Sequence, residues 1–162
     1  MRLPLPQGGR CPKGRGGSVD ELQKKVLLVE DNDDNRIIYA TALRFAGYEV
    51  IEAVTGTEGV QRARTMGPDL ILMDISVPEL DGWEATAILK ADPDTRHIII
   101  LAVTAHALPG DRERSLAAGC DGYLAKPITP AALLREVDLR FGRKTPSYHP
   151  PGPAEPRINP TR

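Results

Sequence analysis

Three carboxylates stand at the ends of two apolar runs in this sequence. Residues 69–74 (DLILMD) end on Asp74, and residues 25–30 (KVLLVE) end on Glu30, which is followed by Asp31. Short apolar runs are typical of strands buried on both faces of a parallel sheet. An acid fits such a strand only at its carboxyl end, which is where ligands bind in open α/β sheets. Asp74 alone is most simply a loop cap, but the three acids converge if the two strands are neighbours.

The loop at residues 30–35 (EDNDDN) has carboxylates where nucleotide-binding folds place phosphate-cradling glycines. It should therefore repel an anion and attract a hard divalent cation. Mg²⁺ prefers oxygen ligands and usually keeps several waters, so two or three carboxylates suffice to bind it, and Mn²⁺ suits similar ligands. Asp33 and Asp34 are more simply explained by the start of a helix, where Asp is favoured by capping and by the helix dipole.

Two other polar residues follow apolar runs. Thr104 comes directly after residues 97–103, and Lys126 after residues 123–125. Either could be ordinary, because Thr is common in strands and Lys is common on surfaces. Together with Asp74 and a divalent cation, however, a hydroxyl and an ammonium complete what is needed to accept a phosphoryl group. The sequence therefore predicts that Asp74 attacks a phosphoryl donor, while Thr104 and Lys126 hold the transferred oxygens.

Alternating strands and helices are predicted to position these residues. We expect strands at 25–30, 48–53, 69–74, 97–103 and 123–125, and helices at 33–46, 57–65, 83–90, 111–118 and 130–141. Strict alternation of this kind predicts a parallel sheet with right-handed crossovers and helices on both faces. The fold class is therefore α/β, a doubly wound five-stranded parallel sheet with five helices.

Composition limits the domain organisation and the ligand classes. The chain has 162 residues and a net charge of −1, but residues 23–141 carry 13 basic and 19 acidic residues, a net of −6. An acidic domain argues against nucleic acid as its ligand. Residues 1–22 are rich in Gly and Pro and residues 143–162 are rich in Pro, so we expect disordered tails around a domain at 23–142. We expect no membrane segment and a cytoplasmic location, because the longest apolar run is far too short to span a bilayer.

In combination, these residues resemble the response-regulator receiver domain, which is also described as CheY-like and has a flavodoxin-like fold. The motifs that carry the resemblance are Glu30-Asp31, Asp74 with Pro78 and Asp81-Gly82, Thr104-Ala105, and Lys126-Pro127. They occur in order over about residues 24–141. The stretch at 73–86 is also similar to single-domain regulators of the DivK type. Val77 departs from the Met that is common in the family, a packing change beside the site.

The resemblance implies strand order 2-1-3-4-5 and a cis peptide bond before Pro127. It also implies that Asp74 accepts a phosphoryl group from a phosphohistidine on a sensor histidine kinase or a histidine phosphotransfer protein. Mg²⁺ or Mn²⁺ would bind Glu30, Asp31, Asp74 and the backbone carbonyl of Ser76. Thr104 and Tyr123 match the family's switch pair, and Lys126 its phosphate-contacting lysine.

The predicted function is that of a single-domain response regulator in a two-component phosphorelay. It is not an enzyme in the usual sense, because it catalyses only its own phosphorylation and slow dephosphorylation. Its output should pass to a downstream protein through the face formed by the fourth helix, fifth strand and fifth helix. Two alternatives are a phosphorylation-independent interaction module and the receiver fragment of a hybrid kinase. A phosphohydrolase is disfavoured, because Ser76 stands where an Asp-x-Asp pair would place its second acid.

Overall fold

The computed structural model describes residues 23–105 and 108–143. The predicted tails, apart from residue 143, lie outside these ranges. Five strands form one sheet in the order β2-β1-β3-β4-β5, and all neighbouring pairs are parallel. This confirms both the fold class and the strand order. The strands are β1 (Lys25–Val29), β2 (Glu49–Ala53), β3 (Leu70–Asp74), β4 (Ile99–Thr104) and β5 (Gly122–Ala125).

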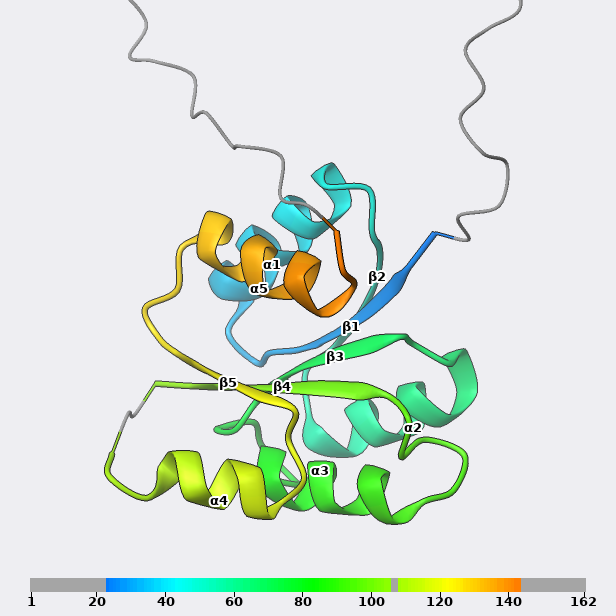
Figure 1. Cartoon of the computed structure of the whole chain (residues 1–162), viewed down its shortest axis with the longest axis vertical. Helices are drawn as coiled ribbons and strands as arrows, with labels where there is room; N and C mark the ends of the chain where they lie inside the picture. The colour runs from blue at the N-terminus through cyan, green and yellow to red at the C-terminus, as the bar shows by residue number, and fades with distance from the viewer. Residues whose placement is uncertain (1–22, 106–107, 144–162) are drawn as a thin grey trace, which may run out of the picture.

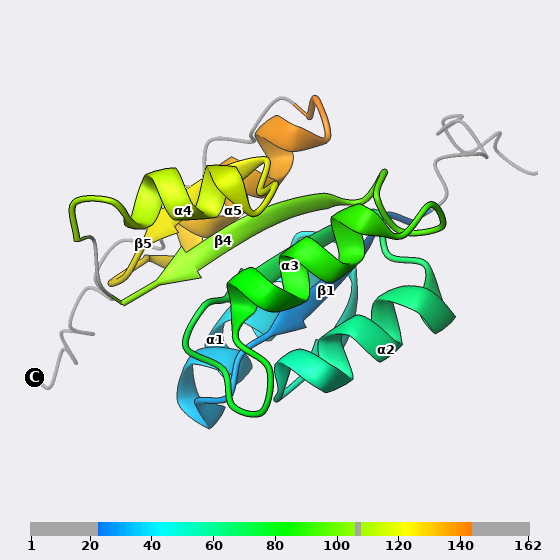
Figure 2. The same ribbon diagram turned by 90° about the horizontal axis from the view of Figure 1, so that it is seen from below.

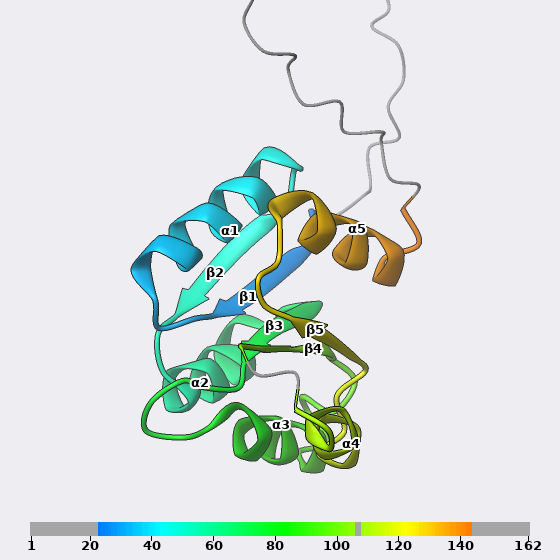
Figure 3. The same cartoon turned by 90° about the vertical axis from the view of Figure 1, so that its left-hand side faces the viewer.

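Helices cover both faces of the sheet. They are α1 (Asp33–Phe45), α2 (Gly56–Met66), α3 (Gly82–Ala91), α4 (Asp111–Ala117) and α5 (Pro130–Arg140). Helices α1 and α5 lie on one face, and α2, α3 and α4 lie on the other (Figures 1 and 3). Viewed from below, α2, α3 and α4 form the outer layer of the second face (Figure 2).

The two central strands, β1 and β3, contribute to both apolar cores. Their side chains alternate, because successive residues of a strand point to opposite faces of a sheet. Leu27 of β1 and Ile71 of β3 pack in the core under α2 and α3, whereas Leu28 and Leu72 pack in the core under α1 and α5. All four side chains are almost fully buried. The register pairs Leu27 with Ile71 and Leu28 with Leu72, so the carboxyl ends of the two strands lie side by side.

Side-chain caps determine where four of the helices begin, next to the carboxyl ends of the strands. The cap residues accept hydrogen bonds from a backbone N–H three residues later, which satisfies one of the free donors of each first turn. These caps are Asn32, Thr55, Asp81 and Thr129. Helix α4 differs, since it begins after Gly110 without a side-chain cap.

The predicted boundaries agree with the structure to within one or two residues. The largest difference is at β4, which begins at Ile99 and not at His97. The turn before it continues further than its sequence suggests, because the N–H of Ile98 donates to the carbonyl of Thr95 at 3.0 Å. Among the described residues, no helix has the length and apolar character that crossing a membrane requires.

Candidate functional site

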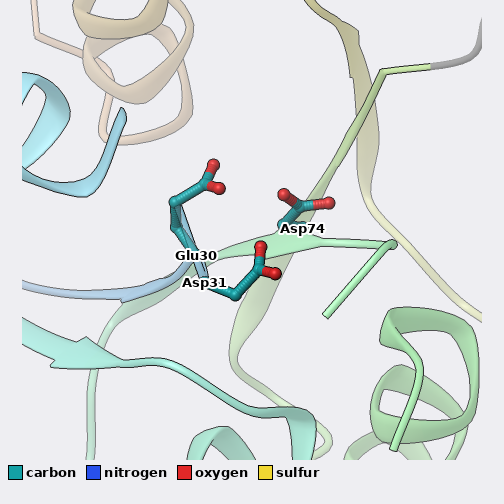
Figure 4. A group of neighbouring side chains, drawn as sticks. All are labelled: Glu30, Asp31 and Asp74. Atoms are coloured by element: carbon teal, nitrogen blue, oxygen red, sulfur yellow. The ribbon is translucent and has the colours of Figure 1, made fainter. Parts of the chain in front are cut away.

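Three acids meet at the carboxyl edge of the sheet. Asp74 is the last residue of β3, and Glu30 and Asp31 follow β1. A carboxylate oxygen from each of the three lies within 4.8 Å of the others. Figure 4 shows the side chains pointing toward one another from the two adjacent strands. Glu30 and Asp74 are buried, whereas Asp31 is exposed. The convergence expected from the sequence is therefore present.

Lys126 comes from the end of the edge strand β5 and contacts two of these acids. Its Nζ donates to Oδ2 of Asp74 at 2.6 Å and to Oε2 of Glu30 at 2.8 Å. Lys126 follows β5, and the peptide bond between Lys126 and Pro127 is cis, as the family resemblance implies. Burial opposes the charge of Lys126, but the hydrogen bonds and charges of Asp74 and Glu30 outweigh burial and raise the pKa of its ammonium group. Lys126 therefore remains charged at neutral pH.

The pocket nevertheless has excess negative charge. Three ionised carboxylates and one ammonium leave a formal charge of −2. Burial raises the pKa of Glu30, the hydrogen bond from Lys126 opposes this effect, and the nearby charge of Asp74 adds to it. A single divalent cation would neutralise the pocket. The donor set also suits Mg²⁺, which binds carboxylate oxygens and keeps part of its water shell, and the exposed Asp31 leaves the pocket open to solvent.

Backbone packing around Asp74 orients its carboxylate. The N–H of Ser76 donates to Oδ1 of Asp74 at 2.8 Å, so each carboxylate oxygen has a partner. Helix α3 begins directly against this segment, because the N–H of Gly82 donates to the carbonyl of Ile75 at 3.1 Å. A Cβ at Gly82 would lie 2.5 Å from the backbone oxygen of Asp74. Glycine is therefore required here by close approach, which explains the Asp81-Gly82 pair.

Thr104 and Tyr123 lie on β4 and β5 beside the acidic pocket. Thr104 is buried at the end of β4, and Tyr123 is half-buried and packs against the core under α2 and α3. Burial raises the pKa of Tyr123, as does the charge of Asp111 on α4, while a hydrogen bond with Thr104 opposes the shift. The two residues of the predicted switch pair are therefore in contact and next to α4.

Trp83 connects α3 with α4. Its Nε1 donates to Oγ of Ser115 at 3.1 Å, and the guanidinium carbon of Arg114 lies 3.9 Å from the centre of its ring. Ser115 is fully buried, so the indole enters the interface between the two helices. Trp83 directly follows Gly82, the glycine that packs against the backbone of Asp74. The interface between α3 and α4 therefore begins one residue after the segment that contacts Asp74.

Sequence reasoning missed one residue of the site. Arg36 of α1 donates from Nη1 to the backbone carbonyl oxygen of Glu30 at 3.1 Å. It also forms ion pairs with Asp33 and, at 3.3 Å, with Glu52 of β2. A contact from a side chain to a backbone carbonyl leaves no pairing pattern in the sequence. Arg36 could have been suspected only as a cation on the first turn of a helix that follows two acids.

Two recesses lie along helix α1. One, of about 400 Å³, opens next to Lys126. It is lined by Asn35, Tyr39, Ala105, Lys126, Pro127 and Ile128. The other, of about 690 Å³, is an apolar groove between α1 and α5. Phe45, on the wall of this groove, has 90% of its surface exposed.

Comparisons with known proteins agree with this geometry. Residues 26–138 match the family model of the response regulator receiver domain. The polar-differentiation response regulator DivK of Brucella ovis is 41% identical over 121 residues, which cover 75% of this chain and 98% of the relative. The chemotaxis response regulator CheY4 of Vibrio cholerae superposes with a TM-score of 0.69 at 30% identity, covering 72% of this chain and 98% of that one.

A third relative is the receiver domain of the sensor histidine kinase PA1611 from Pseudomonas aeruginosa PAO1. It is 42% identical, with a TM-score of 0.69, and the match covers 74% of this chain and 98% of that chain. Its structure has a magnesium ion coordinated in the active site cleft. The family match spans well over half of the present sequence, and the relatives are covered almost completely. The chain thus belongs to the response regulator receiver domain family of two-component signalling proteins.

Proposed function

We propose that this receiver domain, residues 23–142, accepts a phosphoryl group on Asp74 from a phosphohistidine donor and thereby switches a protein-binding face. The observation that carries the proposal is the environment of the Asp74 carboxylate. It is 3% exposed, hydrogen-bonded to Lys126 at 2.6 Å, and within 4.8 Å of oxygens from Glu30 and Asp31. A buried, oriented carboxylate with a neighbouring cation and a potential metal site is suited to covalent phosphoryl transfer.

The oxygens of Glu30, Asp31 and Asp74, with the backbone carbonyl of Ser76, would hold Mg²⁺ or Mn²⁺. Bound there, the ion supplies positive charge that lowers the repulsion between the carboxylate and an incoming phosphoryl group. Asp74 attacks phosphorus, the phosphorus–nitrogen bond to the donor imidazole breaks, and that nitrogen keeps the bonding electron pair. Lys126 and the hydroxyl of Thr104 then bind oxygens of the transferred group. Slow attack by water later releases inorganic phosphate and regenerates the carboxylate.

The contact between Thr104 and Tyr123 supports a switch that reaches α4. Movement of Thr104 toward a phosphoryl oxygen would change its hydrogen bond with Tyr123, whose pKa is raised by burial and by the charge of Asp111 on α4. The face formed by α4, β5 and α5 would then present a new surface to a downstream protein. Reversing a 1:99 equilibrium requires about 5.5 kcal/mol. Two or three new hydrogen bonds to charged groups, at about 1.5–3 kcal/mol each, can supply this free energy.

Two forms of the phosphorelay role have similar support. Identity is 41% to DivK, a response regulator, and 42% to the receiver domain of a sensor histidine kinase. The same transfer to Asp74 applies to a single-domain regulator and to the receiver of a hybrid kinase. A phosphorylation-independent interaction module has less support, because Glu30, Asp31, Asp74 and Lys126 are all present and assembled.

The decisive test is phosphorylation of the wild-type chain and of Asp74→Asn by a phosphorylated histidine phosphotransfer protein with Mg²⁺. We expect an acid-stable, base-labile phosphoryl group on the wild type and none on Asp74→Asn, with circular dichroism showing that both are folded. Asp94→Asn, a substitution in an exposed turn, is the matched control and should be phosphorylated like the wild type. Stable labelling of Asp74→Asn would refute the assignment of the phosphoacceptor.

A further inference from the structure

Asp31 differs from its two neighbours in how it is anchored. Glu30 accepts hydrogen bonds from Lys126 and from the N–H of Asn32 at 3.2 Å, and Asp74 accepts from Lys126 and Ser76. The carboxylate of Asp31 is exposed and makes no hydrogen bond or ion pair with any residue in 23–105 or 108–143. Among the described residues, the only restraint on where this side chain points is therefore the backbone that sets the direction of its Cα–Cβ bond.

That backbone is held by Arg36. The carbonyl oxygen that accepts from Nη1 of Arg36 at 3.1 Å belongs to the peptide unit between Glu30 and Asp31. A peptide unit is planar, so a constraint on its oxygen also constrains the direction of the bond from its nitrogen to the next Cα. Fixing this carbonyl therefore limits where the side chain of Asp31 can point.

The guanidinium group of Arg36 is itself fixed by two acids. Its Nη2 pairs with Asp33, and its Nε lies 3.3 Å from Oε2 of Glu52. The other oxygen of Glu52 is bound by Arg44 at 2.6 Å, which restrains Glu52 in turn. The side chain of Arg36 is only 16% exposed. A planar fork with five donors can make these three contacts at once, whereas an ammonium group cannot reproduce their geometry.

We propose that Arg36 is a positioning residue for the metal site, which acts through the peptide unit between Glu30 and Asp31 to hold the Asp31 carboxylate in its binding direction. The inference rests on the proposed function insofar as that function places Mg²⁺ among the three acids. The inference adds that the affinity for Mg²⁺ depends on the guanidinium group of Arg36, which does not contact the ion.

The sign of the effect distinguishes positioning from simple electrostatics. A guanidinium near the pocket repels a divalent cation, so loss of its charge alone would strengthen Mg²⁺ binding. Loss of the peptide constraint would instead weaken binding, because Asp31 would sample directions that miss the ion. Substitution of groups that orient metal ligands typically costs 10–100-fold in affinity. Positioning therefore predicts weaker binding after Arg36→Met, although a repulsive charge has been removed.

The test is calorimetric titration of the full chain with Mg²⁺, compared among the wild type, Arg36→Met and Arg36→Lys. We expect the dissociation constant to rise about tenfold in Arg36→Met. It should also rise in Arg36→Lys, which keeps the charge but loses the fork. Arg64→Met is the matched control, because it removes an exposed guanidinium that pairs with Asp92 and makes no contact with the loop at Glu30 and Asp31. Its dissociation constant should change by less than about twofold, since a charge at that exposed position is largely screened.

A second measurement separates metal positioning from general damage. Phosphorylation of Arg36→Met should need more Mg²⁺ for half-saturation but reach the wild-type rate at saturating Mg²⁺. Unchanged or tighter Mg²⁺ binding in folded Arg36→Met or Arg36→Lys would overturn this inference and leave the proposed function intact. Failure of the wild type itself to bind Mg²⁺ would overturn both. Arg36→Lys keeps an ion-pair partner for Glu52, so the comparison survives if the Met variant does not fold.

Discussion

Two buried aspartates lie at opposite edges of the sheet and have different surroundings. Asp74 is 3% exposed at the carboxyl edge, and Asp138 of α5 is 6% exposed near the amino edge. Asp74 shares one ammonium group with Glu30 and lies close to Asp31. Asp138 accepts a short hydrogen bond from the hydroxyl of Tyr48, and the guanidinium of Arg143 lies 4.8 Å from the centre of the Tyr48 ring.

The two clusters differ in charge balance. Around Asp138, one carboxylate faces a hydroxyl and a nearby guanidinium, so the cluster is neutral as a whole. Burial, followed by the hydrogen bond and charge of Asp138, raises the pKa of Tyr48, which keeps its proton on the hydroxyl. Around Asp74, three carboxylates face one ammonium. A balanced cluster serves packing, whereas an unbalanced one reduces stability unless a cation or a chemical step compensates for the charge.

The largest expected effect comes from removing the ammonium. Lys126→Met leaves Glu30 and Asp74 without their cation, and breaking a buried pair costs about 3–5 kcal/mol. Because Lys126 is partly exposed and Glu30 can take up a proton, we expect a loss of about 3 kcal/mol. Urea unfolding at neutral pH with a chelator measures it. Lys24→Met, which removes an exposed partner of Asp69, should cost less than about 1 kcal/mol, and equal losses would contradict the comparison.

Adding Mg²⁺ should stabilise the folded chain only by binding to the acidic pocket around Asp74. At a free concentration of 100 times its dissociation constant, binding adds about 2.7 kcal/mol to the free energy of unfolding. Lys126→Met should gain at least as much, because it removes an ammonium group that repels the ion, whereas Asp31→Asn should gain less. Unfolding curves with MgCl₂, against NaCl of equal ionic strength, measure the gain. An equal gain in NaCl would show that general screening, and not the site, stabilises the chain.

A substitution in the Asp138 cluster should reduce stability less than the loss of Lys126 from the acidic pocket. Tyr48→Phe removes the hydroxyl and leaves Asp138 without that hydrogen bond, which should cost about 2 kcal/mol. It should not alter the gain from Mg²⁺ or the phosphorylation of Asp74, because Tyr48 lies at the other edge of the sheet. Chemical unfolding and a phosphorylation time course measure the two properties separately. A slower phosphorylation of Tyr48→Phe would mean that the clusters are coupled and the comparison is too simple.

The sequence predicted the sheet well because strand and helix alternation restricts the topology strongly. The acids at the ends of β1 and β3 could be placed at one edge from connectivity alone, since parallel strands align their carboxyl ends. The same reasoning placed Lys126 at that edge. It could not show that the ammonium contacts both Glu30 and Asp74, because this depends on side-chain conformations that have no periodic pattern.

Contacts between distant segments were beyond sequence reasoning. Tyr48 and Asp138 are 90 residues apart, and neither belongs to a recognisable motif. Arg36 was missed for a different reason, since its partner is a backbone carbonyl that every residue has. The position of Gly122 became clear only from packing: a Cβ there would lie 2.5 Å from Nη2 of Arg140. Such contacts depend on how α5 lies on the sheet.

The smallest expected effect is a change with pH in the contribution of Tyr48. The pKa of Tyr48 is raised above its usual value near 10, so the folded state keeps a proton that the unfolded state loses. Between the two pKa values the folded state binds more protons, and the stability that Tyr48 contributes falls as pH rises. That contribution is complete below pH 10 and declines above it.

The stability difference between the wild type and Tyr48→Phe should therefore be constant from about pH 7 to 9 and shrink above pH 10. Titration of lysines and of the other tyrosines affects both proteins alike, so the difference isolates Tyr48. Urea unfolding of both proteins at several pH values up to 11 measures it. A difference that stays constant or widens above pH 10 would mean that Asp138 does not hold the hydroxyl in its protonated form. The Asp138 cluster would then not be the balanced counterpart of the acidic pocket.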